Sequence, residues 1–308
     1  MSALSNVEGS YGGPAERGAS GWGRAALDSI PPPGLILLGI VSVQVGAGMA
    51  KNLFGLLPPA AVVTMRLATS AIVLVCVARP KLRGLAWRDL AVACAFGLSL
   101  AGMNLSFYEA MARIPLGVAV TIEFLGPLSV AIIASRRRRD LAWAGLAAGG
   151  VLLLARTGGG SLSLVGVGLA LLAGVGWAAY ILLSAATGRR FAGTSGLAIA
   201  SVVGSVVMLP VGIGSAGADL LRPEFLAIGA GVGLLSSVIP YTLEMEALRK
   251  VPAGVFGILM SLEPAVAALV GLAFLGEILS WTEWMAIGCV ILACAGAARS
   301  SQSPPPEV

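Results

Sequence analysis

The chain carries ten apolar segments, one after another, joined by short polar connections. A segment of about 20 apolar residues is long enough to cross the hydrocarbon core of a bilayer, about 30 Å thick, as a helix. Hydrophobic residues make up 57 % of the 308 residues and charged residues only 11 %, which is more apolar sequence than a soluble core needs. The sequence therefore predicts an all-α integral membrane protein with ten transmembrane helices. These helices are expected at 34–57, 60–78, 89–111, 115–135, 141–156, 163–185, 195–214, 224–247, 252–275 and 281–298.

The basic residues are distributed unequally between the two sides of these spans. Fifteen of the 20 Lys and Arg residues fall on the side that also holds both termini, and three fall on the other side. The remaining two, Lys51 and Arg66, lie inside spans. Cytoplasmic loops of membrane proteins carry an excess of Lys and Arg, so both termini are expected to be cytoplasmic. The run Arg136–Arg139 is then interpreted as a topology signal in preference to a site for lipid headgroups.

Two of the predicted spans contain a carboxylate close to a proline. Glu123 and Pro127 lie in the fourth span, and Glu263 and Pro264 lie in the ninth. A carboxylate inside a bilayer is costly, so each glutamate is expected to face a protein interior or a polar cavity. The alternative is a structural carboxylate, hydrogen-bonded to the helix backbone that the proline loosens.

The sequence contains an internal repeat. When residue numbers are shifted by 137, the end of the third span aligns with the end of the eighth, and the fourth span aligns with the ninth. The matched pairs include Glu109 with Glu246, Pro115 with Pro252, Leu125 with Leu262 and Pro127 with Pro264. Each half has five spans, an odd number, so the second half must enter the membrane from the opposite side. Inverted repeats place a substrate site near the midplane and support alternating access in transporters. We therefore expect two inverted repeats, 34–156 and 157–298, with disordered tails at 1–33 and 299–308.

Longer motifs recur in order along the spans. They include GMNLSFY at 102–108, PLGVAVTIEFLGPLSVAIIASRR at 115–137, SSVIPYTLEMEAL at 236–248 and FGILMSLEPAVAALVG at 256–271. On these motifs the chain resembles the two-domain EamA transporters of the drug/metabolite transporter superfamily, and most of all the bacterial threonine/homoserine exporters. The resemblance covers about residues 34 to 298. It implies two EamA repeats and the export of small amino acids across a bacterial cell (inner) membrane, driven by the proton gradient.

A zwitterionic amino acid needs a cation and an anion in one cavity for its two charged groups. Arg66 either clamps a carboxylate or fixes helix packing through an ion pair, and Lys51 either joins the site or extends to the membrane surface. Glu123 and Glu263 are the deepest carboxylates. The other candidates for substrate binding or proton coupling are Gln44, Asn104, Tyr180, Tyr241 and Glu244. Each of the four uncharged residues either contacts substrate or joins helices, which is the commoner use of polar groups inside spans. Glu244 either lines the cavity or lies at the membrane interface.

Some polar residues have simpler explanations. Glu109 is four residues before Arg113, and Glu246 is four before Lys250, so both pairs are expected to form ion pairs along a helix. The four cysteines lie in apolar segments without CxxC spacing and are interpreted as small packing residues.

The chain has no histidine, which excludes histidine-based zinc sites and Ser-His-Asp triads and leaves carboxylates as the natural proton carriers. No cofactor, metal site or nucleic-acid partner is predicted; the expected partners are a small amino acid, protons and the bilayer, and a homo-oligomer stays open. The predicted mechanism is proton antiport, since a carboxyl group away from water favours its protonated form until a substrate ammonium displaces the proton. The alternatives are a transporter of another metabolite or drug on the same fold, a channel, and an intramembrane enzyme.

Overall fold

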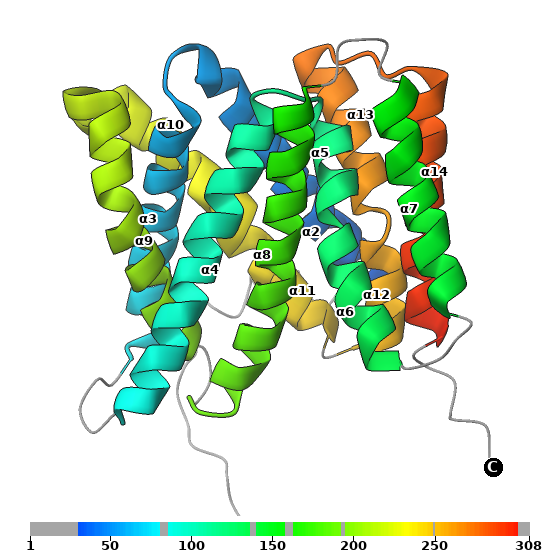
Figure 1. The fold of residues 1–308 in the computed structure, drawn as a ribbon. Helices are drawn as coiled ribbons and strands as arrows, with labels where there is room; N and C mark the ends of the chain where they lie inside the picture. Colours follow the sequence, from blue (N-terminus) through cyan, green and yellow to red (C-terminus); the bar gives the residue numbers. More distant parts are fainter. Residues whose placement is uncertain are drawn as a thin grey trace, which may run out of the picture.

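A computed structural model describes residues 30–80, 86–135, 140–157, 163–191, 195–248 and 250–300. Within these ranges the chain is helical with no β-strand, and its helices run side by side as one bundle (Figure 1). The run Arg136–Arg139 and most of both predicted tails lie outside the described residues. The first helix begins at Pro32, inside the predicted tail. Proline fits the first turn of a helix because the N–H groups there have no intrahelical acceptor.

All ten apolar segments are helical, which confirms the all-α prediction. The first five contain α2 (Pro32–Asn52), η1 (Leu53–Gly55), α3 (Pro59–Ala78), α4 (Trp87–Met111), α5 (Leu116–Glu123), α6 (Leu125–Ser135) and α7 (Asp140–Thr157). The last five contain α8 (Leu164–Gly188), α9 (Ser195–Ala216), η2 (Gly217–Leu221), α10 (Pro223–Gly233), η3 (Leu234–Val238), α11 (Ile239–Leu248), α12 (Ala253–Met260), α13 (Glu263–Leu275) and α14 (Trp281–Ser300).

The length and composition of these helices suit a membrane. Within the described part of the chain, nine helical segments are long and apolar enough to cross a bilayer, and a shorter apolar helix covers Asp140–Leu154. Large apolar side chains such as Ile72, Leu152 and Val206 are more than half exposed. Such exposure is expected where helices face lipid tails, since lipid and not water is the solvent there.

Two spans are interrupted beside their carboxylates. α5 ends at Glu123 and α6 begins two residues later, while α13 begins at Glu263 after a break at Ser261 and Leu262. The prolines that suggested these breaks lie within the first turn of the following helix, Pro127 in α6 and Pro264 in α13. A proline is tolerated there because its missing N–H had no intrahelical acceptor. Each glutamate therefore lies at the end of a half-helix.

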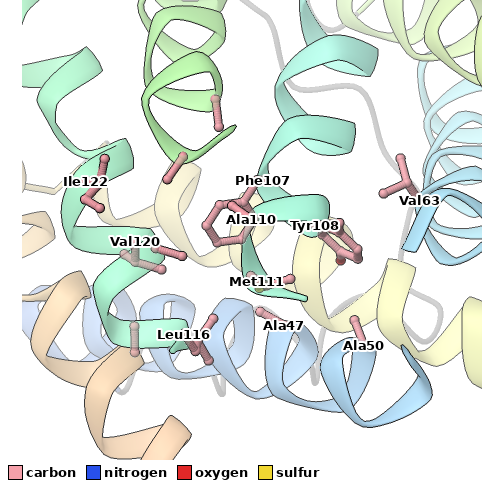
Figure 2. Close-up of a cluster of buried hydrophobic side chains, with 14 of the residues drawn as sticks. Ala47, Ala50, Val63, Phe107, Tyr108, Ala110, Met111, Leu116, Val120 and Ile122 are labelled. Carbon is pink, nitrogen blue, oxygen red and sulfur yellow. The ribbon is translucent and has the colours of Figure 1, made fainter. Parts of the chain in front are cut away.

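Helices from the two halves of the sequence interlock. α4 packs along α8 and α9, α3 packs along α9, α11 packs along α2, and α7 packs along α14. Figure 2 shows part of the buried core, where Tyr108, Met111 and Leu116 of α4 and α5 lie close to Ala47 and Ala50 of α2. This group, which we call the apolar plug, fills the end of the bundle that is uppermost in Figure 1.

The described chain begins and ends at the opposite end of the bundle. Ile30, Val251 and Phe256 all pack against one buried cluster, which includes Leu35 of α2 and Ala247 of α11. Gly257 of α12 in turn lies against Ala298 near the end of α14.

Candidate functional site

One cavity of about 570 Å³ lies inside the bundle. Seven of the nine candidate side chains line it: Gln44, Arg66, Asn104, Glu123, Tyr180, Glu244 and Glu263. They come from α2, α3, α4, α5, α8, α11 and α13, so both halves of the sequence contribute. Tyr241 lies on α11, and its side chain is outside the described part of the structure. Lys51 does not line the cavity.

Acceptors from two other elements hold Arg66 of α3. Its Nη1 donates to Asn104 Oδ1 at 2.6 Å and to the Tyr108 hydroxyl at 3.3 Å, and its Nη2 donates to the Ser236 carbonyl at 3.1 Å. The guanidinium carbon lies 5.5 Å from the centroid of the Tyr108 ring, within cation–π range. Asn104 Nδ2 donates to the Leu100 carbonyl at 2.8 Å, which leaves Asn104 Oδ1 directed toward the arginine.

All of these acceptors are neutral. Among the described residues Arg66 forms no ion pair, and its buried Nε has no hydrogen-bond partner. The ion-pair interpretation of Arg66 therefore does not hold within this part of the chain. A charge that is partly removed from water gains most from an ionic partner with matching hydrogen bonds. The arginine can thus receive a carboxylate from a ligand.

Glu123, the last residue of α5, is 7 % exposed and lines the same cavity. Its carboxylate accepts no hydrogen bond from any described residue, and it interacts electrostatically with Glu263 and Arg66. Close packing of α5 and α6 on α8 sets its position, because the Glu123 carbonyl and Gly126 lie directly against Gly174. Glycine on both helices permits this approach of one backbone to the other.

A methyl group at this contact is expected to disturb the site. In Gly126→Ala the new Cβ would meet the carbonyl group of Gly174, and backbone atoms cannot rotate aside as a side chain can. We expect a loss of about 1–3 kcal/mol of stability, seen as a lower melting temperature in detergent, together with weaker transport. Gly102→Ala is the matched control, since its Cβ would enter open space on α4; an unchanged melting temperature for Gly126→Ala would contradict the packing argument.

Glu263, the first residue of α13, is connected to α2 by one hydrogen bond. Gln44 Nε2 donates to Glu263 Oε1 at 2.9 Å, and the two residues are 1 % and 6 % exposed. The amide oxygen of Gln44, Oε1, and the second carboxylate oxygen of Glu263, Oε2, are both buried without a hydrogen-bond partner. The structural alternative requires a hydrogen bond between each carboxylate and the helix backbone. Within the described chain neither Glu263 nor Glu123 accepts such a bond. Both carboxylates retain acceptor capacity toward a ligand.

Lys51 lies outside the cavity and pairs with a carboxylate of the chain itself. Its Nζ pairs with Glu277 Oε1 at 2.5 Å and donates to the Ile114 carbonyl at 2.7 Å. Glu277 Oε2 accepts from the backbone N–H of Leu116 at 2.8 Å. That N–H is at the start of α5 and has no intrahelical acceptor, and a carboxylate is favourable at a helix N-terminus. The ion pair thus joins α2, α5 and the loop before α14 at the end of the bundle closed by the apolar plug.

Removing the charge of Glu277 is expected to leave Lys51 unpaired. Glu277→Gln keeps an oxygen for Leu116 N–H, so the variant tests the ion pair alone. We expect a loss of about 2 kcal/mol of stability, between the values for exposed and buried pairs, measured as a lower melting temperature in detergent. Glu224→Gln is the control, because the Arg222–Glu224 pair is at least half exposed; equal effects of the two variants would contradict a partly buried role.

The other predicted residues are also accounted for. Glu244 and Tyr180 line the cavity, and so does Trp177, three residues before Tyr180 on α8. The predicted helical ion pairs are confirmed, at 2.5 Å between Glu109 and Arg113 and at 3.2 Å between Glu246 and Lys250. Two groups that hold Arg66, and the partner of Lys51, were not predicted.

Tyr108 and the Ser236 carbonyl hold Arg66 beside the cavity, whereas Glu277 pairs with Lys51 outside it. Only Glu277 had a usable signal, since a carboxylate just outside a span is a natural partner for a lysine just inside one. The contacts of Tyr108 and of the Ser236 carbonyl with Arg66 depend on how α3, α4 and η3 pack.

Apolar helices that interlock around a polar cavity with half-helix carboxylates define the class as a multi-pass membrane transporter. The chain belongs to the EamA-like transporter family, in the drug/metabolite transporter superfamily, as its motifs predicted; the family model matches residues 164–299. The chain is 38 % identical to the threonine/homoserine exporter RhtA of Salmonella typhimurium (strain LT2), over 88 % of this chain and 92 % of the relative.

Two further comparisons agree. The chain is 39 % identical to the threonine/homoserine exporter RhtA of Escherichia coli (strain K12), over 85 % of this chain and 89 % of the relative. A solved crystal structure with 17 % sequence identity superposes with a TM-score of 0.56, covering 87 % of this chain and 99 % of that one. At this identity the superposition supports the fold alone.

Proposed function

We propose that the protein exports small hydroxy amino acids such as threonine and homoserine across a bacterial inner membrane, by proton antiport with alternating access. The observation that carries this proposal is that Arg66, Glu123 and Glu263 line one cavity. Arg66 forms no ion pair with a carboxylate in the described chain. The arginine suits the α-carboxylate of an amino acid, and the glutamates suit its ammonium. The similarity to threonine/homoserine exporters supports the same substrate class.

Alternating access is supported by the shape of the cavity. The cavity extends along α3 from Arg66 through Leu74 to Val77, which is 73 % exposed, so it reaches the surface at the lower end of Figure 1. The other end is closed by the apolar plug and the Lys51–Glu277 pair. The described basic residues Arg79 and Arg88 flank the open end, which makes it the cytoplasmic end by the positive-inside rule.

The topology follows from the same reasoning. We take α7 as the tenth span, because it packs along α14 despite its shorter apolar stretch. The third span of the first half, α4, packs on the first span of the second half, α8. Correspondingly α11, in the third span of the second half, packs on α2, the first span of the first half. This reciprocal packing supports two inverted five-helix repeats. Both termini are then cytoplasmic.

In the proposed cycle the proton and the substrate exclude one another. With the cavity open to the cytoplasm, the substrate ammonium enters beside Glu263 and Glu123, and the carboxylic acid of Glu123 releases its proton to the cytoplasm. The ammonium then pairs with the carboxylate that remains. After the cavity opens outward, a proton from outside binds Glu123 and the amino acid leaves.

The test is transport into and out of liposomes with an imposed pH gradient. Radiolabelled threonine and homoserine are compared with leucine and a lipophilic cation. Gradient-dependent movement of the hydroxy amino acids alone is the expected result. Movement of leucine or of the cation instead would keep the fold and overturn the substrate, and movement without any dependence on the gradient would overturn the antiport.

A further inference from the structure

The eighth span contains a turn of π-helix, η3, which ends two residues before Pro240. In this turn the N–H of Ile239 donates to the carbonyl of Leu234, five residues earlier. Proline has no N–H. The carbonyls of Leu235 and Ser236, which lie five and four residues before Pro240, therefore receive no hydrogen bond from residue 240. A π turn and a proline together leave two backbone acceptors open to groups outside their own helix.

Side chains from two other helices use these acceptors. Ser42 Oγ of α2 donates to the Leu235 carbonyl at 2.7 Å, and Arg66 Nη2 of α3 donates to the Ser236 carbonyl at 3.1 Å. Pro240 is buried and lines the cavity, as does Ser236. The carbonyl that the proline leaves open thus contacts the only embedded cation that lines the cavity within the described chain.

Glycines hold η3 close to both partner helices. A Cβ on Gly46 of α2 would meet the backbone N of Ser236, and a Cβ on Gly233 would meet Thr69 and the backbone of Arg66. This close packing fixes the Ser236 carbonyl relative to α3, so the carbonyl does not move when the Arg66 side chain changes its rotamer. The acceptor and its distance to the guanidinium are set by backbone and not by a flexible side chain.

We propose that Pro240 and the π turn Leu234–Val238 are a positioning element for Arg66, and so determine how the cavity binds a ligand carboxylate. The inference rests on the proposed function, in which Arg66 receives the carboxylate of an amino acid. Asn104 and Tyr108 hold Nη1, and the Ser236 carbonyl holds one N–H of Nη2. One N–H of Nη2 and the unpartnered Nε–H remain, and a planar guanidinium uses two such donors for a bidentate carboxylate.

The discriminating variant is Pro240→Ala, which restores an N–H directed at the released carbonyls. The eighth span then becomes a more regular helix. We therefore expect the melting temperature of the variant in detergent to be equal to or higher than that of the wild type. We expect the affinity for threonine to fall about tenfold, as for loss of one hydrogen bond to a charged group. The affinity for threonine amide, which lacks the carboxylate, is expected to stay the same. Pro210→Ala is the matched control, since Pro210 also lies inside a helix, α9, but does not line the cavity.

A ligand-independent measurement separates this inference from the proposed function. Labelling of Arg66 by phenylglyoxal, followed by mass spectrometry, is expected to become several times faster in Pro240→Ala and to be unchanged in Pro210→Ala. Unchanged labelling, or an equal loss of affinity for threonine and its amide, would overturn the positioning role. If the wild-type protein binds neither ligand but Pro240→Ala still exposes Arg66, the substrate proposal fails and the positioning role stands.

Discussion

Arg66→Lys is expected to lower gradient-driven export of threonine by about 100-fold, even though the variant keeps the positive charge. Arginine presents a planar fork of donors that matches a carboxylate, whereas lysine presents a compact charge on a flexible stem. Losing a hydrogen-bonded partner of a desolvated charge costs at least about 2 kcal/mol, and each 1.4 kcal/mol is about tenfold. The lysine would also leave Asn104 Oδ1 and the Ser236 carbonyl without their shared donor.

The measurement is initial export rate from liposomes at several threonine concentrations, with the melting temperature recorded for each variant. Arg113→Lys is the control, because Arg113 is paired with Glu109 on a more exposed helix surface, and it should transport like the wild type. Arg66→Ala should be at least as impaired as Arg66→Lys. Near-normal export by Arg66→Lys would mean that the site needs only a charge, and near-normal export by Arg66→Ala would remove Arg66 from the substrate site altogether.

The sequence predicts the helices well because the bilayer imposes a simple rule. Backbone polar groups that face lipid cannot bond to water, so a long apolar segment satisfies nearly all of them by folding as a helix. The cost of embedded charge likewise makes Arg66, Glu123 and Glu263 candidates for a polar cavity, and all three line the one described above.

The same rule does not decide the place of Lys51, which the structure shows outside the cavity. A lysine near the end of a span can be compensated by the substrate, by water or by a carboxylate from elsewhere in the chain, and the sequence does not decide among these. The partner, Glu277, is brought to α2 by the turn after α13, where Gly276 adopts a left-handed conformation with φ 66°. Pro240 lies inside a motif of the eighth span, but the sequence does not reveal which side chains take up the carbonyls that this proline releases. Those partners, Ser42 and Arg66, are fixed only when α2, α3 and η3 pack together.

Glutamine at the two buried carboxylates is expected to separate proton coupling from substrate binding. Glu123 has no hydrogen-bond partner in the described chain, so it can exchange a proton for an ammonium without breaking another contact. Glu263 is oriented by Gln44 and is better suited as a fixed acceptor for the ammonium. We therefore expect Glu123→Gln to lose gradient-driven export at least about tenfold while still exchanging labelled for unlabelled threonine. Glu263→Gln is expected to lose both activities, since its remaining amide cannot pair with a charged ammonium.

Both activities are measurable in one liposome preparation, by comparing net export under a pH gradient with counterflow at equal pH. Glu109→Gln is the control, because Glu109 pairs with Arg113 and does not line the cavity; it should retain both activities. The reverse pattern, in which Glu263→Gln keeps exchange and Glu123→Gln loses it, would exchange the two roles and keep the antiport. If both glutamine variants keep full gradient-driven export, then neither carboxylate carries the coupled proton. The acid–base step would then have to belong to one of the other two carboxylates of the described lining. These are Glu244, which interacts electrostatically with Glu263, and Glu246, which pairs with Lys250.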